Sequence, residues 1–252
     1  MRITVLGSAS GLAVPHRNPS AYLLEVEHSL YLIDAGDGVA RQLVRYRVDP
    51  KRIACIFISH THPDHAAGLF FLLQLMHLSN RRDPLCIYLP QDLLPGFHTI
   101  FPYFQIYPGK WPFRFDLLPI SEGVVMEDKG FQLSAIPNDH LMENRHLADK
   151  SGSGVDSFSF HFSEGKNGDA FYTSDVNSLT HLRAVSSRVD VLISECTHLE
   201  IEEIIDFAHS AGIPKVILTH IPPELEGSSL SKKKQHKNIM VEFAEDGYVI
   251  EV

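Results

Sequence analysis

The sequence His60-Thr61-His62-Pro63-Asp64-His65 places three imidazoles and one carboxylate within six consecutive positions. It directly follows the apolar run Ile53–Ile58, which is typical of a buried strand. The polar side chains therefore stand where a strand ends and a loop begins, and rigid scaffolds commonly present reactive groups at such positions. Imidazole nitrogens and carboxylate oxygens are ligands that suit zinc, iron and manganese. The hexapeptide predicts a metal site.

The length of 252 residues, without a Pro/Gly/Ser-rich linker or an internal repeat, predicts one domain spanning residues 1–252. The start of the chain lacks the features of a signal peptide. No stretch approaches the roughly 20 apolar residues of a membrane span, so we expect no membrane contact. Cys55, Cys86 and Cys196 lie in apolar runs, which favours reduced core residues and a cytoplasmic protein over a disulfide framework.

The net charge of −9 argues against a broad electrostatic grip on nucleic acid, because that affinity comes from Lys and Arg facing phosphates. A small phosphate-bearing substrate remains compatible, since a bound metal supplies positive charge locally. The basic cluster Lys232-Lys233-Lys234 with Lys237 lies in a serine-rich segment, and we interpret it as a solvated loop.

The pattern of apolar runs predicts many strands with helices between them. The expected strands are 3–6, 21–26, 29–33, 53–58, 85–89, 113–118, 123–126, 131–136, 157–162, 170–173, 189–194 and 216–219. A further strand pair, 241–243 and 248–252, is expected to turn at Asp246-Gly247. Helices are expected at 39–46, 66–78, 177–186 and 200–211, with 66–78 buried nearly all round. This mixture predicts a layered α/β architecture with more than one sheet.

A hydrolytic site with two metal ions needs about seven protein ligands, with positions left for water and substrate. The hexapeptide supplies four, so the others must come from strand ends elsewhere. His140, Asp175 and His220 each follow a short apolar run by a few residues. His146 and His161 compete with His140 in the same stretch of sequence. The spacing alone leaves that choice open.

The chain resembles the metallo-β-lactamase fold superfamily, a four-layer αββα sandwich that carries a His-x-His-x-Asp-His motif. It is most similar to the ribonuclease Z-like and cyclic phosphodiesterase branch of that superfamily. Beyond the hexapeptide, four blocks carry this resemblance: Leu6–Gly11 with Arg17, Asn18 and Ser20; Ile33–Gly38 with Arg41–Leu43; Asp190–Thr197; and Val216–His220. The match runs nearly from end to end.

The resemblance implies two divalent metal ions, with zinc favoured and manganese or iron as alternatives. One ion would be held by His60, His62 and His140, the other by Asp64, His65 and His220, and Asp175 would bridge them. A hydroxide between the ions would be the nucleophile. Asp34 would orient a ligand histidine, and His198 would contact the scissile phosphate or protonate the leaving group. Asp64 and His198 are thus the residues expected to carry catalysis.

These expectations favour a dinuclear metal-dependent phosphodiesterase acting on a small or cyclic phosphodiester. Only 35 positions separate His140 from Asp175, too few for the long RNA-gripping arm of typical ribonuclease Z enzymes. RNA 3′-end processing stays an alternative, as does a lactonase or thioesterase that attacks a carbonyl ester. A metal-binding sensor or an iron redox protein is a different class of answer, because the ligand set does not fix the metal.

An aromatic cluster leaves three interpretations open: a substrate pocket, a homodimer interface or a loop folded onto the core. It comprises Phe97, Phe101, Tyr103, Phe104, Tyr107 and Trp111. An exposed patch of such residues would favour a homodimer.

Overall fold

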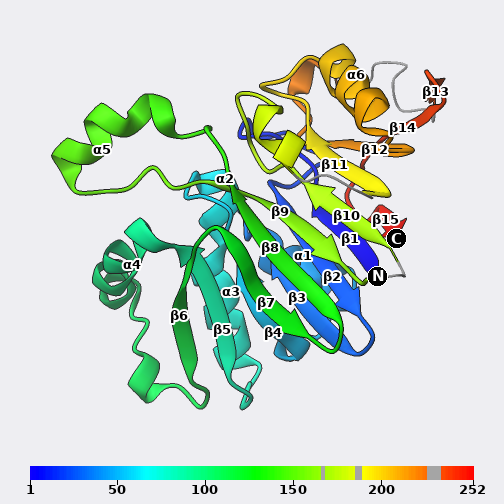
Figure 1. Ribbon diagram of the computed structural model, residues 1–252. Helices are drawn as coiled ribbons and strands as arrows, with labels where there is room; N and C mark the ends of the chain where they lie inside the picture. The colour runs from blue at the N-terminus through cyan, green and yellow to red at the C-terminus, as the bar shows by residue number, and fades with distance from the viewer. Residues whose placement is uncertain (166–167, 185–188, 226–233) are drawn as a thin grey trace.

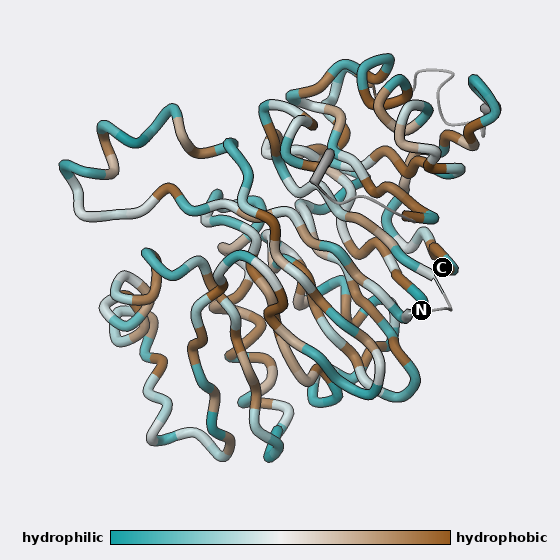
Figure 2. Tube along the Cα trace, in the orientation of Figure 1, coloured by the Kyte–Doolittle hydropathy of each residue, from teal (hydrophilic) through white to brown (hydrophobic). Residues whose placement is uncertain are grey.

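Two mixed β-sheets lie face to face at the centre of the molecule, as the ribbon in Figure 1 shows. The computed structural model describes residues 1–165, 168–184, 189–225 and 234–252. Hydrophobic positions concentrate in the strands and in the helices packed on them, and many loops are hydrophilic (Figure 2). Lys232 and Lys233, part of the predicted solvated loop, lie outside the described residues, whereas Lys234 begins a short strand.

The first sheet has the strand order β15-β1-β2-β3-β4-β5-β6. Its strands are β1 (Arg2–Gly7), β2 (Ala21–Val26), β3 (Ser29–Ile33), β4 (Ile53–Phe57), β5 (Leu85–Pro90), β6 (Phe115–Ile120) and β15 (Val249–Glu251). Strands β3 to β6 are parallel, and the others pair antiparallel. Parallel strands end at a common edge, and the chain leaves β4 into the hexapeptide at that edge.

The second sheet has the order β13-β14-β12-β11-β10-β9-β8-β7. Its strands are β7 (Gly123–Asp128), β8 (Phe131–Pro137), β9 (Phe158–Ser163), β10 (Asp169–Tyr172), β11 (Val191–Glu195), β12 (Lys215–Thr219), β13 (Lys234–His236) and β14 (Ile239–Phe243). The strands β10, β11, β12 and β14 run parallel to one another. His220 and Asp175 therefore follow the carboxyl ends of strands that point the same way.

Three apolar layers hold the sandwich together. The central layer joins inward-facing residues of both sheets, with Phe57 stacked on Tyr88 and Phe160 at its edge. A second layer packs α1 (Val39–Arg45), α3 (Gly68–Leu78) and α4 (Leu94–Ile100) on the first sheet. The third packs α6 (Ile201–Ala211) on the second sheet. This is the predicted four-layer αββα sandwich, which the structure confirms.

Two further helices and several 3₁₀ turns complete the described chain. The helices are α2 (Pro63–Ala66) and α5 (Arg145–Ser151), and the turns are Pro50–Arg52, Gln91–Leu93, Phe101–Phe104, Pro108–Lys110, Met142–Asn144, Thr180–Ala184 and Pro223–Leu225. Nothing in the sequence patterns led us to expect α5. It belongs to a segment, residues 141–157, that extends away from the two sheets (Figure 1). We call this segment the α5 excursion.

The expected helix 66–78 is only partly correct. It is divided at Ala67 into α2 and α3, and only one face of α3 is buried. Leu69, Leu72, Leu73 and Met76 pack inward with the spacing of one helical face. Phe71 and Leu78 are 61% and 72% exposed. Apolar residues occur on every face of this helix, but only the face toward the sheet is buried.

The expected helix 177–186 is wrong for the described residues, which contain only the 3₁₀ turn Thr180–Ala184. Polar contacts with a part of the chain distant in sequence replace the helical pattern here. The Asn177 side chain donates to the carbonyl oxygens of Asp139 and His140, and the backbone N–H of Asn177 donates to Asp139 Oδ1. These bonds hold the backbone at Asn177 against the Asp139–His140 segment in a nonhelical conformation.

The expected C-terminal strand pair is also wrong, because β14 and β15 belong to different sheets. Asp246 lies between them, and its carboxylate accepts hydrogen bonds from the backbone N–H groups of Ser8 and Asn18 and from the side chain of Gln42. The N–H of Gly247 donates to the carbonyl of Val5. These long-range bonds carry the chain across to the first sheet instead of closing a hairpin.

Candidate metal centre

The hexapeptide is fixed in place by the loop that follows β3. Ala35 N–H donates to the His65 carbonyl at 2.7 Å, and Gly68 N–H donates to the Ala35 carbonyl at 2.8 Å. A Cβ on Gly36 would lie 2.2 Å from the Asp64 carbonyl oxygen, so only glycine permits this approach. Pro63 occupies the first position of α2, where its missing N–H costs nothing. The two segments form one rigid support for the ligand side chains.

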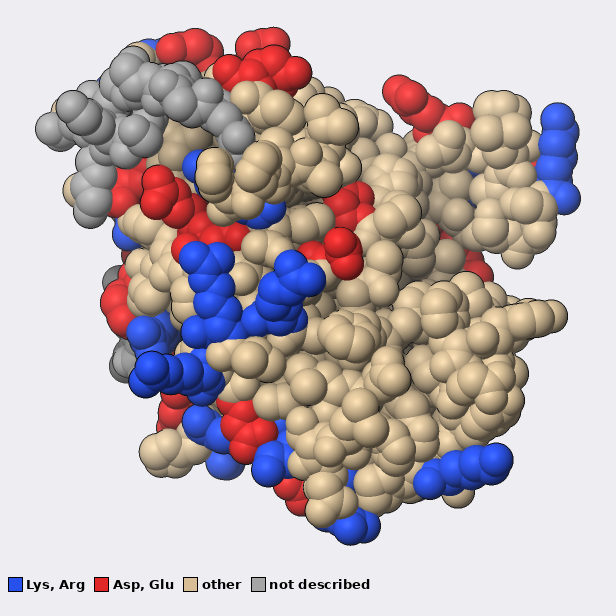
Figure 3. Space-filling model, turned by 180° about the vertical axis from the view of Figure 1, so that it is seen from behind, with Lys and Arg blue, Asp and Glu red and all other residues tan. Residues whose placement is uncertain are grey.

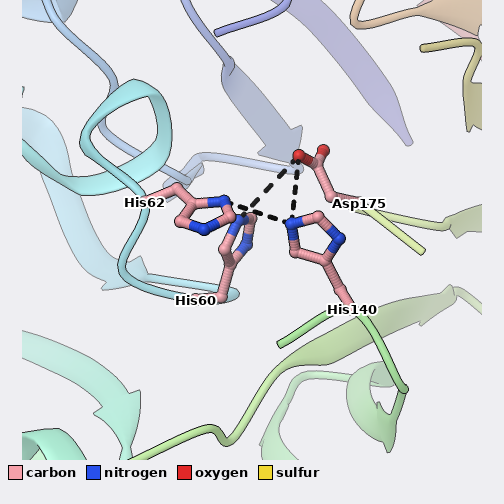
Figure 4. A group of neighbouring side chains, drawn as sticks. All are labelled: His60, His62, His140 and Asp175. Atoms are coloured by element: carbon pink, nitrogen blue, oxygen red, sulfur yellow. Dashed lines mark hydrogen bonds and ion pairs between the residues drawn. The ribbon is translucent and has the colours of Figure 1, made fainter. Parts of the chain in front are cut away.

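Seven ligand-type side chains converge at the edge of the two sheets where β4, β10 and β12 end. They form two groups, each with ligand atoms within 4.8 Å of one another: His60, His62, His140 and Asp175; and Asp64, His65, Asp175 and His220. Figure 4 shows the first group, in which the three imidazoles and the carboxylate point toward one another. The structure thus brings together every residue expected as a ligand, and Asp175 is shared by both groups.

The distances between the side chains fit ligands of common ions. Asp175 Oδ2 lies 3.9 Å from His60 Nε2 and 3.7 Å from His140 Nε2. The other group is as tight, with 3.2 Å from Asp175 Oδ1 to His65 Nε2 and 3.2 Å from Asp175 Oδ2 to His220 Nε2. Ligands at about 2.0–2.1 Å from one zinc ion in tetrahedral geometry are separated by distances of this order.

Several of these atoms are buried without a hydrogen-bond partner among the described residues. They include His60 Nε2, His65 Nε2 and Asp175 Oδ1. Buried polar atoms are normally paired, and each exception needs a physical explanation. A metal ion at each group would satisfy these lone pairs at once, so the donor set fits divalent metal.

The opposite ring nitrogens are held by hydrogen bonds. His65 Nδ1 lies 2.8 Å from Asp34 Oδ2, and His60 Nδ1 lies 3.0 Å from Ser59 Oγ. His220 Nδ1 lies 3.2 Å from Ser20 Oγ. Such partners fix the orientation of ligand imidazoles. Asp34, which the resemblance singled out for this role, lies where it can perform it.

Asp34 is itself enclosed by donors. It is fully buried and accepts hydrogen bonds from the Ser59 N–H at 2.8 Å and the Tyr172 hydroxyl at 3.0 Å. Sequence reasoning missed Ser20, Ser59, Ser174, Tyr172 and Glu195 as parts of the centre. Ser59 adjoins the motif and Ser174 adjoins Asp175, whereas Ser20 and Glu195 lie in two blocks of the family resemblance; these positions were the only signals.

Three site residues adopt a left-handed backbone conformation although none is glycine. The φ angles are 57° at Asp34, 54° at Ser174 and 52° at His220. Each residue directly follows the end of a strand or lies one position beyond it. Non-glycine residues in this region cost of order 1 kcal/mol or more and cluster at functional sites. The turns at the strand ends are therefore held in place by the surrounding packing.

Burial and neighbouring charges set the protonation of the ligands. Burial lowers the pKa of His60 well below its usual value, lowers that of His220, and lowers that of His140 to about 4. Burial opposes charge on His65 too, but the carboxylates of Asp175 and Asp34 raise its pKa well above the ordinary value. Metal ligation requires neutral imidazole, and most of the cluster is already held in that form.

His198 lies at the rim of the same centre. Its ring centroid is 4.9 Å from that of His140, and its Nδ1 is 3.2 Å from Oε1 of the buried Glu195. Glu195 Oε2 also accepts from the backbone N–H groups of Thr197 and His198. The hydrogen bond to Glu195 raises the pKa of His198. This histidine is thus oriented and favoured in its protonated form.

The two histidines that competed with His140 lie elsewhere. His161 is on β9 and pairs with Asp169 at 3.1 Å. His146 is exposed on α5. The site opens to solvent through a cavity of about 350 Å³ that is lined by His62, Asp64, Asp175, His198, His220 and the 10–12 and 222–224 loops.

Comparisons with known sequences support this assignment. The family described as "Beta-lactamase superfamily domain" matches residues 30–221, and the chain belongs to that superfamily. A protein named ribonuclease Z from Methanosarcina acetivorans is 26% identical over 100% of this chain and 98% of its own length. A ribonuclease Z from Methanosarcina mazei is 31% identical over 56% of this chain but only 45% of its own length.

Solved structures share the fold over the whole chain. Human tRNase Z, short form, has a TM-score of 0.76 at 22% identity and covers 100% of this chain and 99% of its own. A structure described as a new diphosphatase from the PhnP family has a TM-score of 0.75 at 18% identity, covering 100% and 97%. With the family match and the convergent ligand set, the chain is a metal-dependent hydrolase.

Among the described residues, no helix is long and apolar enough to cross a membrane.

Proposed function

We propose that the protein is a dinuclear metal-dependent phosphodiesterase, with the whole chain, residues 1–252, acting as one hydrolase domain. The observation that carries the proposal is the pair of ligand groups that share Asp175. Two adjacent ions suit a phosphodiester, because such a pair can contact both the attacking and the leaving oxygen. When bound, the ions would supply an activated water and positive charge for the phosphoryl oxygens.

The metal ligands would divide as the two groups divide. His60, His62 and His140 would hold one ion, Asp64, His65 and His220 would hold the other, and Asp175 would bridge them. We propose zinc as the resident metal, because an imidazole-rich set suits it, although manganese and iron accept the same ligands. Asp34 would keep His65 oriented through the 2.8 Å hydrogen bond.

His198 would protonate the leaving oxygen. Glu195 engages its Nδ1, which leaves Nε2 available to a substrate in the cavity. The raised pKa of His198, caused first by the Glu195 hydrogen bond, keeps a proton ready near neutral pH. A protonated imidazole can then neutralise charge as the leaving alcohol departs. Asp64, as an ion ligand on the cavity wall, would position the reacting centre.

A small phosphodiester is the substrate class we favour. The mouth of the cavity carries Glu224 and no Lys or Arg among its described lining residues, so it offers little attraction for a long polyanion. RNA 3′-end processing is the second candidate. The full-length match to a protein named ribonuclease Z favours it, and the α5 excursion supplies a short protrusion that was not expected from the sequence.

The test is hydrolysis of bis(p-nitrophenyl) phosphate by purified protein of known metal content, beside an ester and a lactone. Phosphodiester turnover that disappears in Asp64→Ala supports the proposal. Cleavage of the ester or lactone alone, with two metals bound, would overturn it in favour of a lactonase or thioesterase. An RNA with a 3′ extension, assayed in parallel, separates the two phosphodiester candidates.

We also propose a homodimer. The aromatic cluster divides: Phe97 and Phe101 are buried, whereas Tyr103 is 83% and Phe104 is 55% exposed. Figure 3 shows that the corresponding side of the rear face, over α4, carries few charged side chains. Exposed aromatic side chains on a face with few charges favour association. Sedimentation equilibrium of the wild type and of Tyr103→Glu tests the proposal. A monomeric wild type would contradict it.

The three cysteines are free, which supports our further proposal of a reducing, cytoplasmic location.

A further inference from the structure

A second cavity lies directly behind the metal motif. Its volume is about 450 Å³, and it is bounded by the hexapeptide and the α2–α3 junction, by α4, and by the end of α5 with residues 152–153. Its walls are mainly apolar and include Pro63, Phe70, Leu93, Phe97 and Ile100. Neither the ligand set nor the proposed mechanism uses this space.

The hexapeptide is the wall between the two cavities. Thr61 and Pro63 line the apolar cavity, whereas His62 and Asp64 line the metal cavity. Thr61 and His62 precede α2, whereas Pro63 and Asp64 begin it, and side chains from both parts of this junction face each of the two cavities. Residues 61–64 are half-buried or exposed. The wall between the two cavities is therefore not fully buried.

One carboxylate lines the apolar cavity. Asp92 Oδ2 accepts a hydrogen bond from the Asp156 N–H at 3.1 Å, but Asp92 Oδ1 is buried with no hydrogen-bond partner among the described residues. A carboxylate in this position repels a second phosphate. The chemistry of the cavity thus matches an uncharged group with a large apolar surface.

We infer that the apolar cavity binds one ester group of the phosphodiester substrate, an uncharged ring- or chain-bearing group that reaches across Thr61 and Pro63. This inference rests on the proposed function, because the phosphate is placed at the metal centre. A nucleobase, an aryl ring and an alkyl chain share the required chemistry. A volume of about 450 Å³ is large enough for any of the three. A substrate with two small ester groups would leave the cavity unused.

Gly96 allows the cavity to be filled without disturbing the fold. It lies on α4 and lines the cavity, and a Cβ at this position meets no atom within 4 Å. Gly96→Leu would occupy the space and also favour the helix, since glycine is a poor helix former. Gly109→Leu is the matched control. Gly109 is also free of neighbours within 4 Å, but it lies outside the cavity.

The experiment compares two substrates that release the same product. Bis(p-nitrophenyl) phosphate and methyl p-nitrophenyl phosphate differ in one ester group, and the ratio of their kcat/KM values measures the preference for the larger one. We expect Gly96→Leu to lower this ratio about tenfold, a typical effect of apolar pocket contacts. Gly109→Leu should leave it unchanged. Comparing variants in this way cancels the intrinsic reactivity difference between the substrates.

A binding measurement separates this inference from the proposed function. Calorimetric titration of the zinc-loaded protein with phenylphosphonate and methylphosphonate requires no turnover. Gly96→Leu should weaken phenylphosphonate about tenfold and leave methylphosphonate unchanged. An unaltered kcat/KM ratio together with unaltered phosphonate binding would overturn the inference. Failure of the wild type to cleave either diester would instead overturn the proposed function, and the titration would then decide about the cavity alone.

The variants Gly96→Leu and Gly109→Leu also show which kind of ester group the apolar cavity binds. Phenyl, octyl and adenosine p-nitrophenyl phosphodiesters present a ring, a chain and a nucleobase. The substrate whose kcat/KM falls most in Gly96→Leu relative to Gly109→Leu identifies the class. Equal values in both variants for all three substrates would contradict the inference.

Discussion

The metal centre and the α5 excursion are neighbours built in opposite ways. The candidate ligands of the centre follow strands of both sheets, and His60, His65 and Asp175 are almost completely buried. The excursion has a small apolar cluster of its own, Leu141, Ala148 and Val155. Many long-range contacts hold the metal centre in place, whereas few contacts hold the α5 excursion.

This difference suggests that the metal centre carries out catalysis and that the α5 excursion influences substrate preference. A rigid set of strand ends keeps ligands and their hydrogen-bond partners in a fixed arrangement. A segment with few buried contacts opens at low free energy and tolerates sequence change. Because the excursion lines the apolar cavity, changes within it would alter substrate preference and leave the metal centre intact. The following predictions test this division, beginning with the largest effect.

Asp175→Ala should abolish metal binding and hydrolysis at the metal centre. Asp175 is the residue common to both groups, and its loss leaves the surrounding imidazoles without the shared carboxylate. We expect a loss of bound metal and a fall in phosphodiester turnover of at least about 10³-fold. Metal analysis of the purified variant and the bis(p-nitrophenyl) phosphate assay measure both. Asp206→Ala, on the exposed surface of α6, is the control. Full metal content in the Asp175 variant would show that the bridge is not essential.

His198→Ala should lower turnover without loss of metal. Since His198 is not among the ligand groups, metal content should match the wild type. We expect about 10²-fold slower hydrolysis when the leaving group is an alcohol, the range of general acid catalysis. The loss should be smaller when p-nitrophenolate leaves, because that group needs little protonation. Equal losses for both leaving groups would rule out proton donation, and Glu195→Gln should show the same selectivity in weaker form.

Asp34→Asn should have an intermediate effect, confined to metal affinity. The amide can still accept from the Ser59 N–H, but it no longer offers a second carboxylate oxygen to His65 Nδ1. Loss of such a partner typically costs about 10–100-fold in metal affinity. Competition with a zinc chelator measures this. Asp37→Asn, an exposed aspartate of the same loop, is the matched control, and equal affinities in the two variants would contradict the assigned role.

The contrast also explains what the sequence could predict. The hexapeptide, Asp175 and His220 were found because each follows a short apolar strand, which is a local pattern. The four-layer sandwich followed from the order of such runs and from the resemblance. His140 could not be separated from His146 and His161 by spacing, because only the three-dimensional paths of β8, β9 and α5 distinguish them. Those paths depend on contacts between residues distant in sequence.

Failures of prediction concentrate where long-range polar contacts override local pattern. The turn at Asp246-Gly247 looked like a hairpin, but Asp246 bonds to Ser8 and Asn18 across the sheets. Asn177 similarly holds a nonhelical segment against Asp139. The excursion itself was missed because the charged and glycine-rich sequence around α5 carries little apolar periodicity. The excursion thus has few apolar residues, which explains both its weak sequence pattern and its few packing contacts with the two sheets.

Gly154→Ala should produce the smallest effect, limited to the excursion. A Cβ on Gly154 would lie 1.4 Å from Asp92 Oδ2 and 2.3 Å from Asp92 Cβ, so the aspartate must move as a whole. That movement breaks its 3.1 Å hydrogen bond with the Asp156 N–H, a contact worth about 1 kcal/mol. We expect faster hydrogen exchange in residues 141–157, with exchange in β4 and β12 and the metal content unchanged. Ser153→Ala is the control, because it alters the neighbouring position without adding a side chain toward Asp92. If Gly154→Ala also loosened the strand ends or released metal, the excursion and the centre would form one cooperative unit, and the separation of selectivity from chemistry would be wrong.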